Sequence, residues 1–175
     1  MLGGLGRVAY PGRVTRWLDE DEQRVWRAYL AVSRKLPQAL ERQIQDEAGL
    51  PHTYYIVLAM LSEAPGRSLR MSELAETVSS SPSRLSHAVD RLTERGWVRR
   101  EQASGDRRGN LAVLTDEGWQ VVRDAAPGHV RAVRENLFDL LTPEQLKVLD
   151  EVFGTVRAHL DRQAADVGGP ALDSP

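Results

Sequence analysis

Apolar residues recur at helical spacing in several segments of this chain, and proline, glycine and serine separate the segments. In the first, apolar positions lie three or four residues apart from residue 19 to about Ala48, with Pro37 inside the run. Because proline removes a backbone hydrogen bond, we expect it to kink this helix rather than necessarily end it. Gly49 closes the segment, and Pro51 opens a second helix over residues 54–63.

A short helix, a tight turn and a longer amphipathic helix come next. Ser72 is the expected N-cap of a helix over residues 73–78, and the turn consists of residues 79–81, all of them serine. Ser81 followed by Pro82 combines an N-cap with proline at the first helical position, so we expect a helix from here to Gly96. Two helices joined by so short a turn are the skeleton of a helix-turn-helix.

Beyond Gly96 the hydrophobic period changes from helical to strand-like. Residues 97–101 and 110–114 predict two short strands, joined by the polar segment 103–109. A hairpin that directly follows a helix-turn-helix is a wing. The sequence therefore predicts a winged helix-turn-helix over residues 51–118, with a two-stranded wing.

Two more helices are expected after the wing. Thr115 caps one that runs to about Leu141, and a capping box of Thr142 and Gln145, with proline between them, starts the last one. The predicted fold class is mainly α: a single domain over residues 19–162, in which N- and C-terminal helices flank the winged helix-turn-helix. Glycine and proline mark residues 1–18 as a flexible arm and residues 163–175 as a disordered tail.

Composition excludes several classes of function. The chain of 175 residues has no cysteine, which rules out disulfides, thiolate catalysis and cysteine-ligated zinc. His52, His129 and His159 lie far apart in sequence without i,i+4 spacing, so no metal site is predicted. Without paired carboxylates, a Ser–His arrangement or a phosphate loop, we expect no enzyme and no cofactor. With no signal peptide and no membrane-length apolar run, the expected location is cytoplasmic, without a membrane partner.

Positive charge gathers in one region although the net charge of the chain is −2. Between residues 84 and 110 there are seven arginines and four acidic residues. The helix over 81–96 has an inward apolar stripe of Leu85, Ala88, Val89 and Leu92. Its opposite face carries Ser83, Arg84, Ser86, His87, Asp90 and Arg91. Short hydroxyls, arginine and histidine near a helix N-terminus suit the base edges and phosphates of double-stranded DNA. An isolated helix of this kind is more often a solvated surface helix, but the adjoining turn and wing favour DNA.

The loop of the predicted hairpin carries the second candidate contact. Arg107 and Arg108 are adjacent, so one guanidinium can enter a narrow minor groove while the other meets a phosphate. Asp106 would orient an arginine by bidentate pairing. A polar turn with solvated charges is the alternative interpretation of this loop.

Several motifs together resemble the MarR family of bacterial transcriptional regulators. These are Leu-Arg-Met-Ser-Glu-Leu-Ala-Glu from residue 69, Leu85-x-x-x-Val-Asp-Arg-Leu-x-x-x-Gly96, Asp106-Arg-Arg, and Leu114-Thr-Asp-Glu-Gly118. The resemblance implies a homodimer whose first and last helices, residues 19–48 and 119–162, interlock. Each winged domain would bind half of a palindromic operator, usually as a repressor, and a small aromatic molecule often releases it.

By position in that family pattern, Ser81, Ser83, Arg84 and His87 would face bases or phosphates, and Arg107 or Arg108 would be the wing arginine. The sequence also departs from the pattern. Pro82 stands where the family often has a basic or polar residue, His87 replaces a common arginine, and Ala103 replaces an acidic residue of the wing loop. These differences bear on which operator is read and not on the fold.

Five aromatic residues are candidates for an effector pocket between the dimerisation helices and the winged domain. They are Trp26, Tyr29, Tyr54, Tyr55 and Trp119. Residues of this kind more often belong to the core. The other open alternative is a winged helix that docks a protein and binds no specific DNA, although such a module has no reason to gather arginine on both helix and wing.

Overall fold

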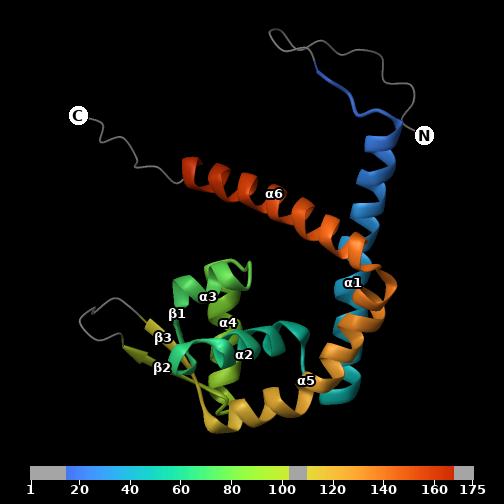
Figure 1. Ribbon diagram of the computed structural model, residues 1–175. Helices are drawn as coiled ribbons and strands as arrows, with labels where there is room; N and C mark the ends of the chain where they lie inside the picture. Colours follow the sequence, from blue (N-terminus) through green and yellow to red (C-terminus); the bar gives the residue numbers. More distant parts are fainter. Residues whose placement is uncertain (1–14, 103–109, 168–175) are drawn as a thin grey trace, which may run out of the picture. The chain divides into compact units, whose positions relative to one another are not determined.

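The computed structural model describes residues 15–102 and 110–167, which divide between two compact units, residues 1–38 and 39–175 (Figure 1). Helix α1 (Glu20–Ala48) is continuous and belongs to both units, and the division falls after Gln38, the residue that follows Pro37. The predicted single domain over 19–162 stays a prediction. Within the described ranges, no helix is both long and apolar enough to cross a membrane.

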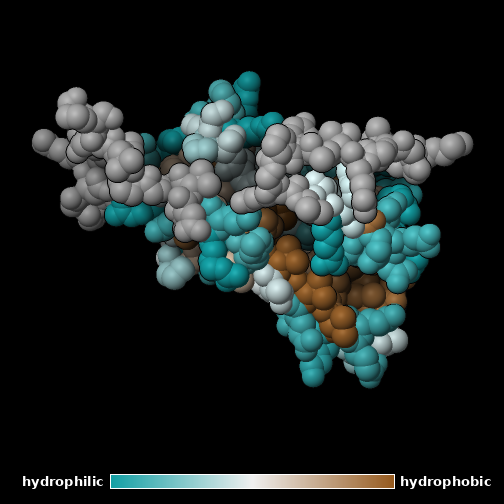
Figure 2. Space-filling view, turned by 90° about the horizontal axis from the view of Figure 1, so that it is seen from above, coloured by the Kyte–Doolittle hydropathy of each residue, from teal (hydrophilic) through white to brown (hydrophobic). Residues whose placement is uncertain are grey.

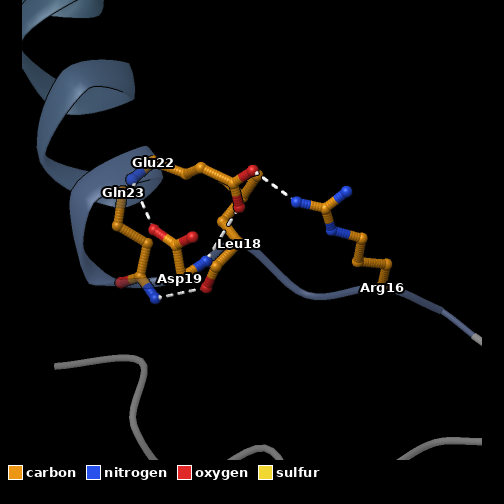
Figure 3. A network of polar contacts seen from close by, with 5 residues as sticks. All are labelled: Arg16, Leu18, Asp19, Glu22 and Gln23. Carbon is orange, nitrogen blue, oxygen red and sulfur yellow. Dashed lines mark hydrogen bonds and ion pairs between the residues drawn. The ribbon is translucent and has the colours of Figure 1, made fainter.

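A capping box starts α1 in the first unit (Figure 3). The Asp19 carboxylate accepts a hydrogen bond from the Glu22 N–H (2.8 Å), and the Glu22 carboxylate accepts one from the Asp19 N–H (2.9 Å). Arg16 pairs with the other oxygen of Glu22 at 3.0 Å, and the Gln23 amide donates to the Leu18 carbonyl. These bonds satisfy N–H groups that have no partner inside the helix, which explains why α1 begins at the acidic run.

The first unit leaves its large apolar side chains open to solvent. Trp26 and Tyr29 stack on one another, with ring centroids 5.5 Å apart and an interplanar angle of 23°. The exposed apolar residues of α1 in this unit are Val25, Trp26, Tyr29, Leu30 and Val32. Nothing within the described part of this unit covers them.

The second unit contains the predicted winged helix-turn-helix and two long helices after it (Figure 1). Its elements after α1 are α2 (His52–Glu63), η1 (Pro65–Arg67), β1 (Ser68–Arg70), α3 (Met71–Thr77), α4 (Pro82–Glu94), β2 (Val98–Gln102), β3 (Asn110–Leu114), α5 (Asp116–Asn136), η2 (Phe138–Leu140) and α6 (Pro143–Val167). The mainly α fold class with a winged helix-turn-helix is confirmed.

The sheet has three antiparallel strands in the order β1-β3-β2, one more than the sequence predicted. Strand β3 is central, with Leu69 of β1 opposite Ala112 and Arg100 of β2 on its other side. Strand β1 could not be predicted, because three residues are too few to show an alternation. The additional strand attaches the hairpin to the segment that leads into α3.

Helix α4 starts and ends where the sequence predicts. The Ser81 hydroxyl accepts a hydrogen bond from the Arg84 N–H at 3.4 Å, and Pro82 is the first helical residue. At the other end Gly96 has a φ of +74°, which glycine adopts without strain, and the Trp97 N–H donates to the Leu92 carbonyl at 3.0 Å. This Schellman arrangement turns the chain from α4 into β2.

The inward stripe of α4 lies at the centre of the main core. Leu85, Val89 and Leu92 are each at most 2% exposed, and Ala88 is also buried, as the sequence predicted. The other buried members of this core are Val57, Leu58, Leu61, Leu74, Ala75, Val98, Ala112, Leu114 and Val122. All three helices of the winged domain, two strands and α5 therefore share one core.

Several helix boundaries differ from the predicted ones. Helix α2 begins at His52, two residues early, and α3 begins at Met71, so Ser72 lies in its first turn and is not its N-cap. The Glu73 carboxylate accepts a hydrogen bond from the Arg70 N–H at 3.2 Å instead. The turn before α4 also includes Val78, and α5 ends at Asn136 with the separate 3₁₀ turn η2 after it.

Helix α6 begins at the predicted capping box and ends later than predicted. The Thr142 hydroxyl accepts from the Gln145 N–H (3.3 Å), and the Gln145 side chain accepts from the Thr142 N–H (2.9 Å). The helix continues to Val167, so the first part of the predicted disordered tail is helical. The rest of that tail, and most of the predicted arm, lie outside the described residues.

A close contact joins the start of α5 to the end of the α4–β2 turn. Thr115, the N-cap of α5, donates from its hydroxyl to the Gly96 carbonyl (2.7 Å) and from its N–H to the Trp97 carbonyl (3.0 Å). Gly118 is buried here, and a Cβ added to it would overlap the Trp97 carbonyl oxygen and lie 2.8 Å from Cδ1 of Leu114. Only glycine allows the helix to approach the backbone so closely.

Replacing this glycine should therefore destabilise the protein. We expect Gly118→Ala to lower the free energy of unfolding by about 2 kcal/mol, because the steric cost exceeds the gain in helix propensity. Gln120→Ala, at an exposed position of the same helix, should change it by less than about 0.5 kcal/mol. Urea unfolding of both variants measures this, and equal stabilities would contradict the close contact.

Candidate nucleic-acid interface

The face of α4 opposite the core is open to solvent. Ser83, Arg84 and His87 are exposed there, close to the helix N-terminus. Within residues 15–102 and 110–167, the side chains of Arg84 and His87 have no hydrogen-bond or ion-pair partner. A cation and an imidazole beside the positive end of a helix dipole are thus available to an anionic partner.

Two other predicted residues of α4 are engaged within the helix. The Arg91 guanidinium pairs with Glu94 at 2.8 Å, although both side chains are more than half exposed. The Ser81 hydroxyl caps the helix while the residue stays exposed. A surface pair of this kind is weak and exchanges readily with water or another anion, so Arg91 is still available.

Ser86 is placed differently from the rest of the predicted set. It is half-buried, and its hydroxyl accepts a hydrogen bond from Arg100 of β2 at 3.1 Å. The same nitrogen of Arg100 donates to the Ser86 carbonyl (3.3 Å) and pairs with Asp90 (2.7 Å). Ser86 and Asp90 therefore face the wing strand, and the outward face of α4 is narrower than the sequence suggested.

The hairpin after α4 begins and ends in described strands. Gln102 and Asn110 pair across its base, and Arg99 forms an ion pair with Glu101 of its own strand at 2.6 Å. The predicted wing contacts Asp106, Arg107 and Arg108 lie in segment 103–109, outside the described residues. Their roles stay predictions.

The aromatic residues predicted for an effector pocket have separate surroundings. Trp26 and Tyr29 belong to the first unit, whereas the other three lie in the second. There Tyr54 is half-buried with the Arg95 guanidinium 5.7 Å from its ring, Trp119 lies under Arg67 at 4.6 Å, and Tyr55 is buried beside His129. Each of these three rings has its own neighbours, as core aromatics do.

A cavity of about 290 Å³ does open in the second unit, between the end of α1 and the middle of α5. Its lining residues are Glu47, Ala48, Leu50, Val121, Asp124 and Ala125, which include none of the five aromatic candidates. Glu47 is held by Arg131, which bonds both carboxylate oxygens at 2.7 and 3.0 Å. The prediction of an aromatic effector pocket thus gains no support from the placement of its residues.

Comparison with known structures decides the family. The crystal structure of Sco3205, a MarR family transcriptional regulator from Streptomyces coelicolor in complex with DNA, is 53% identical in sequence, covers 83% of this chain and 91% of its own, and has a TM-score of 0.80. AbsC, a MarR family regulator from the same organism, is 44% identical, covers 84% of this chain and 99% of its own, and also has a TM-score of 0.80. The chain belongs to the MarR family of transcriptional regulators.

Two further comparisons agree with this assignment. A model of the MarR family matches residues 48–109, which contain α2 to β2 and the loop of the wing. The transcriptional repressor MprA of Escherichia coli is 25% identical over 118 residues, which are 67% of this chain and 66% of the repressor's length. The family resemblance inferred from the sequence motifs is confirmed.

This MarR-family chain also has a cluster of rings that the sequence did not predict. The rings of His52 on α2 and His129 on α5 lie 5.1 Å apart, and Tyr55 lies 4.5 Å from His129. Nε2 of His52, Nδ1 of His129 and the amide of Gln43 are buried without a hydrogen-bond partner in the described residues. Those residues include no group of three or more His, Asp or Glu that would hold a metal ion.

Burial shifts the titration of this ring cluster. It lowers the pKa of His129, and the nearby His52 lowers it further. Burial also lowers the pKa of His52, with Glu41 acting in the opposite direction. Burial raises the pKa of Tyr55, to which Glu63 adds. All three groups therefore favour their neutral forms in the folded chain.

The contact between His52 and His129 could not be predicted, because the two residues are far apart in the chain and on different helices. Arg100 was missed for a different reason. Strand alternation places Arg99 and Arg100 on opposite faces of β2, and only Arg100 is turned toward α4. Applying this alternation to the two arginines would have indicated that one of them faces the helix.

The histidine pair should make stability depend on pH. An unfolded histidine has a pKa of about 6.5 and the folded values are lower, so between them the unfolded chain binds more protons. The free energy of unfolding should therefore fall as the pH drops through about 6.5 and level off below the folded-state pKa. Urea unfolding from about pH 8 to pH 5 measures this. His129→Gln should flatten the dependence, and an unchanged slope in this variant would contradict the assignment.

Proposed function

We propose that this chain regulates transcription by binding a palindromic DNA operator as a homodimer, and that it acts as a repressor. The exposed face of α4 carries the proposal, because Arg84 and His87 lie there beside the helix N-terminus with no hydrogen-bond or ion-pair partner among the described residues. Such a helix fits the major groove, while a hairpin next to it reaches the adjacent backbone or minor groove.

The relatives support the same partner and direction of regulation. Sco3205, which is 53% identical to this chain, was crystallised in complex with DNA, and MprA is named a transcriptional repressor. Arginine is concentrated on α4 and β2 in a chain whose net charge is −2, which favours a local contact with DNA over general adhesion. Release by a small aromatic molecule stays a prediction.

The dimer is proposed from apolar surface that the monomer leaves open. Figure 2 shows a band of hydrophobic surface between hydrophilic areas on one face of the molecule. The large exposed apolar residues of α6 are Leu146, Val148, Val152, Phe153, Val156 and Leu160, each at least 44% exposed. Most of them recur three or four residues apart, so they form one stripe along the helix. Stripes of this size on soluble proteins usually bury themselves against another chain.

A second copy of this chain is the partner that accounts for both the apolar stripe of α6 and the exposed face of α4. A two-fold dimer presents two α4 helices related by the same axis, and two such helices require a DNA site with the same symmetry. The exposed apolar residues of α1 offer further surface of the same kind. Dimerisation and the palindrome are therefore parts of one proposal.

Removing the guanidinium of Arg84 from the exposed face of α4 should weaken DNA binding. We expect Arg84→Ala to lose about 1–3 kcal/mol of binding free energy, which is about 5- to 150-fold in affinity. Arg123→Ala removes the same charge from an exposed position of α5, and it should change the affinity by less than about twofold. The measurement is fluorescence anisotropy or gel shift with DNA adjoining the gene, at one fixed salt concentration.

The unmodified chain provides the decisive result. A salt-sensitive complex that prefers one DNA sequence supports the regulator. If nanomolar protein gives no such complex with any segment of that DNA, the proposal is wrong and a protein-docking winged helix becomes the better interpretation. Deletion of the gene should raise transcription from the bound promoter, and a fall would show activation instead of repression.

The apolar stripe of α6 can be tested separately from DNA. Phe153→Glu should turn the dimer into a monomer at micromolar concentration, because it places a charge in a desolvated interface. Ala158→Glu introduces the same charge on the opposite face of α6 and should leave the dimer intact. Sedimentation velocity distinguishes the two. A wild-type monomer, or two variants that behave alike, would contradict the proposed interface.

A further inference from the structure

Arg100 connects the wing to α4 through a single nitrogen. Its Nη2 donates to the carbonyl of Ser86, to the hydroxyl of Ser86 and to the carboxylate of Asp90, at 3.3, 3.1 and 2.7 Å. Ser86 and Asp90 are four residues apart, so their side chains lie on one flank of α4. The Arg100 side chain is 30% exposed, which leaves little of it available to a partner outside the chain.

Within the described residues, this is the second of two hydrogen-bonded connections between α4 and residues 97–102, and Val98 of β2 also packs in the core beside α4. The first is the hydrogen bond from the Trp97 N–H to the Leu92 carbonyl, at the end of the helix. Arg100 reaches α4 further from that end, between Ser86 and Asp90. The Trp97 hydrogen bond and the packing of Val98 hold the start of β2 against α4, and Arg100 adds a contact two residues further along the strand, toward the wing. This outer contact limits the range of angles that the rest of the hairpin can take relative to α4.

The neighbouring arginine has no such role. Arg99 is 56% exposed, and its ion-pair partner Glu101 belongs to the same strand. Arg99 and Arg100 have equal charge and adjacent places in β2, so they differ mainly in direction. Arg99 thus provides a matched control for charge and for position along the strand.

An ion pair with this much exposure contributes little to global stability. Asp90 is 53% exposed, so solvent screens its attraction to Arg100. The contact is more specific in position than in energy, because the three acceptors surround one nitrogen of Arg100 and hold the end of its side chain at one place on the flank of α4. The contact is therefore better suited to hold two elements at an angle than to keep the chain folded.

We propose that Arg100 is a positioning residue, which sets the angle between α4 and the β2–β3 hairpin so that both meet the operator together. The inference rests on the proposed function, since it assigns a residue that acts on DNA binding through α4. Ser86 and Asp90 belong to this connection, and they contribute to affinity without touching DNA.

The test compares the affinity of the full chain with that of Arg100→Ala, Asp90→Ala and the double variant, on DNA adjoining the gene at one salt concentration. Each single variant should bind about tenfold more weakly, and the double variant no more weakly than either, because both remove the same contact. For Asp90→Ala, the direction of the change in DNA affinity is informative. Removal of a carboxylate near DNA should strengthen binding electrostatically, so weaker binding requires a positional effect.

Two controls separate positioning from charge and from unfolding. Arg99→Ala should change the affinity by less than about threefold, and thermal unfolding should show little loss of stability in any of these variants. Amide hydrogen exchange in the free protein should become faster in β2 and β3 for Arg100→Ala and Asp90→Ala and stay unchanged for Arg99→Ala. If Arg100→Ala does not fold, Arg100→Lys keeps the charge, loses the planar geometry and should bind more weakly.

Two results would overturn the inference while the proposed function stands. One is an Asp90→Ala variant that binds as tightly as the wild type or more tightly. The other is an Arg100→Ala variant whose salt dependence falls by about one phosphate contact, which would make Arg100 a direct ligand of the backbone. A wild-type chain that forms no sequence-preferring complex overturns the proposed function itself, and that result is obtained before any variant is made.

Discussion

The burial of one face of α4 is the constraint on which the rest of the winged domain depends. Leu85, Val89 and Leu92 are enclosed by α2, α3, the sheet and α5, so the helix cannot rotate about its axis without exposing them. The same restriction decides what faces outward. The outward position of Arg84 and His87 is thus a consequence of core packing, and a hydrophobic requirement determines which residues are offered to DNA.

The second unit combines a dry core with a polar junction. Around α4 no polar residue is buried in the described part of the chain. Where α1, α2 and α5 meet, by contrast, the two neighbouring imidazoles and the amide of Gln43 have buried atoms without hydrogen-bond partners among the described residues. Unpaired buried polar groups cost free energy, so this junction holds less tightly than the core beside it. The core around α4 is therefore the more tightly held part of this unit, and the junction of α1, α2 and α5 at Gln43, His52 and His129 is the less tightly held one.

The sequence predicted what local chemistry determines and missed what depends on contacts between distant segments. The stripe of α4, its Ser81 cap and the capping box at Thr142 were readable because each needs only residues a few positions apart. Strand β1 was missed, since its partner is β3, and the turn of Ser86 toward Arg100 was missed because it depends on the register of β2. The contact between His52 and His129 likewise exists only after α2 and α5 have packed. The proposed DNA-binding face could therefore be outlined from sequence, but its edges could not.

The glycine at the start of α5 has a consequence for how signals can travel through this protein. Because Gly118 lies against the Trp97 backbone and Thr115 bonds both Gly96 and Trp97, the base of α5 is fastened to the turn between α4 and β2. A displacement of the first turn of α5 would therefore act directly on the turn between α4 and β2. In the proposed dimer, a ligand that displaced α5 would change the separation and tilt of the two winged domains, while each domain kept its own core. Regulation would then act through the orientation of the winged domains and not through their local unfolding.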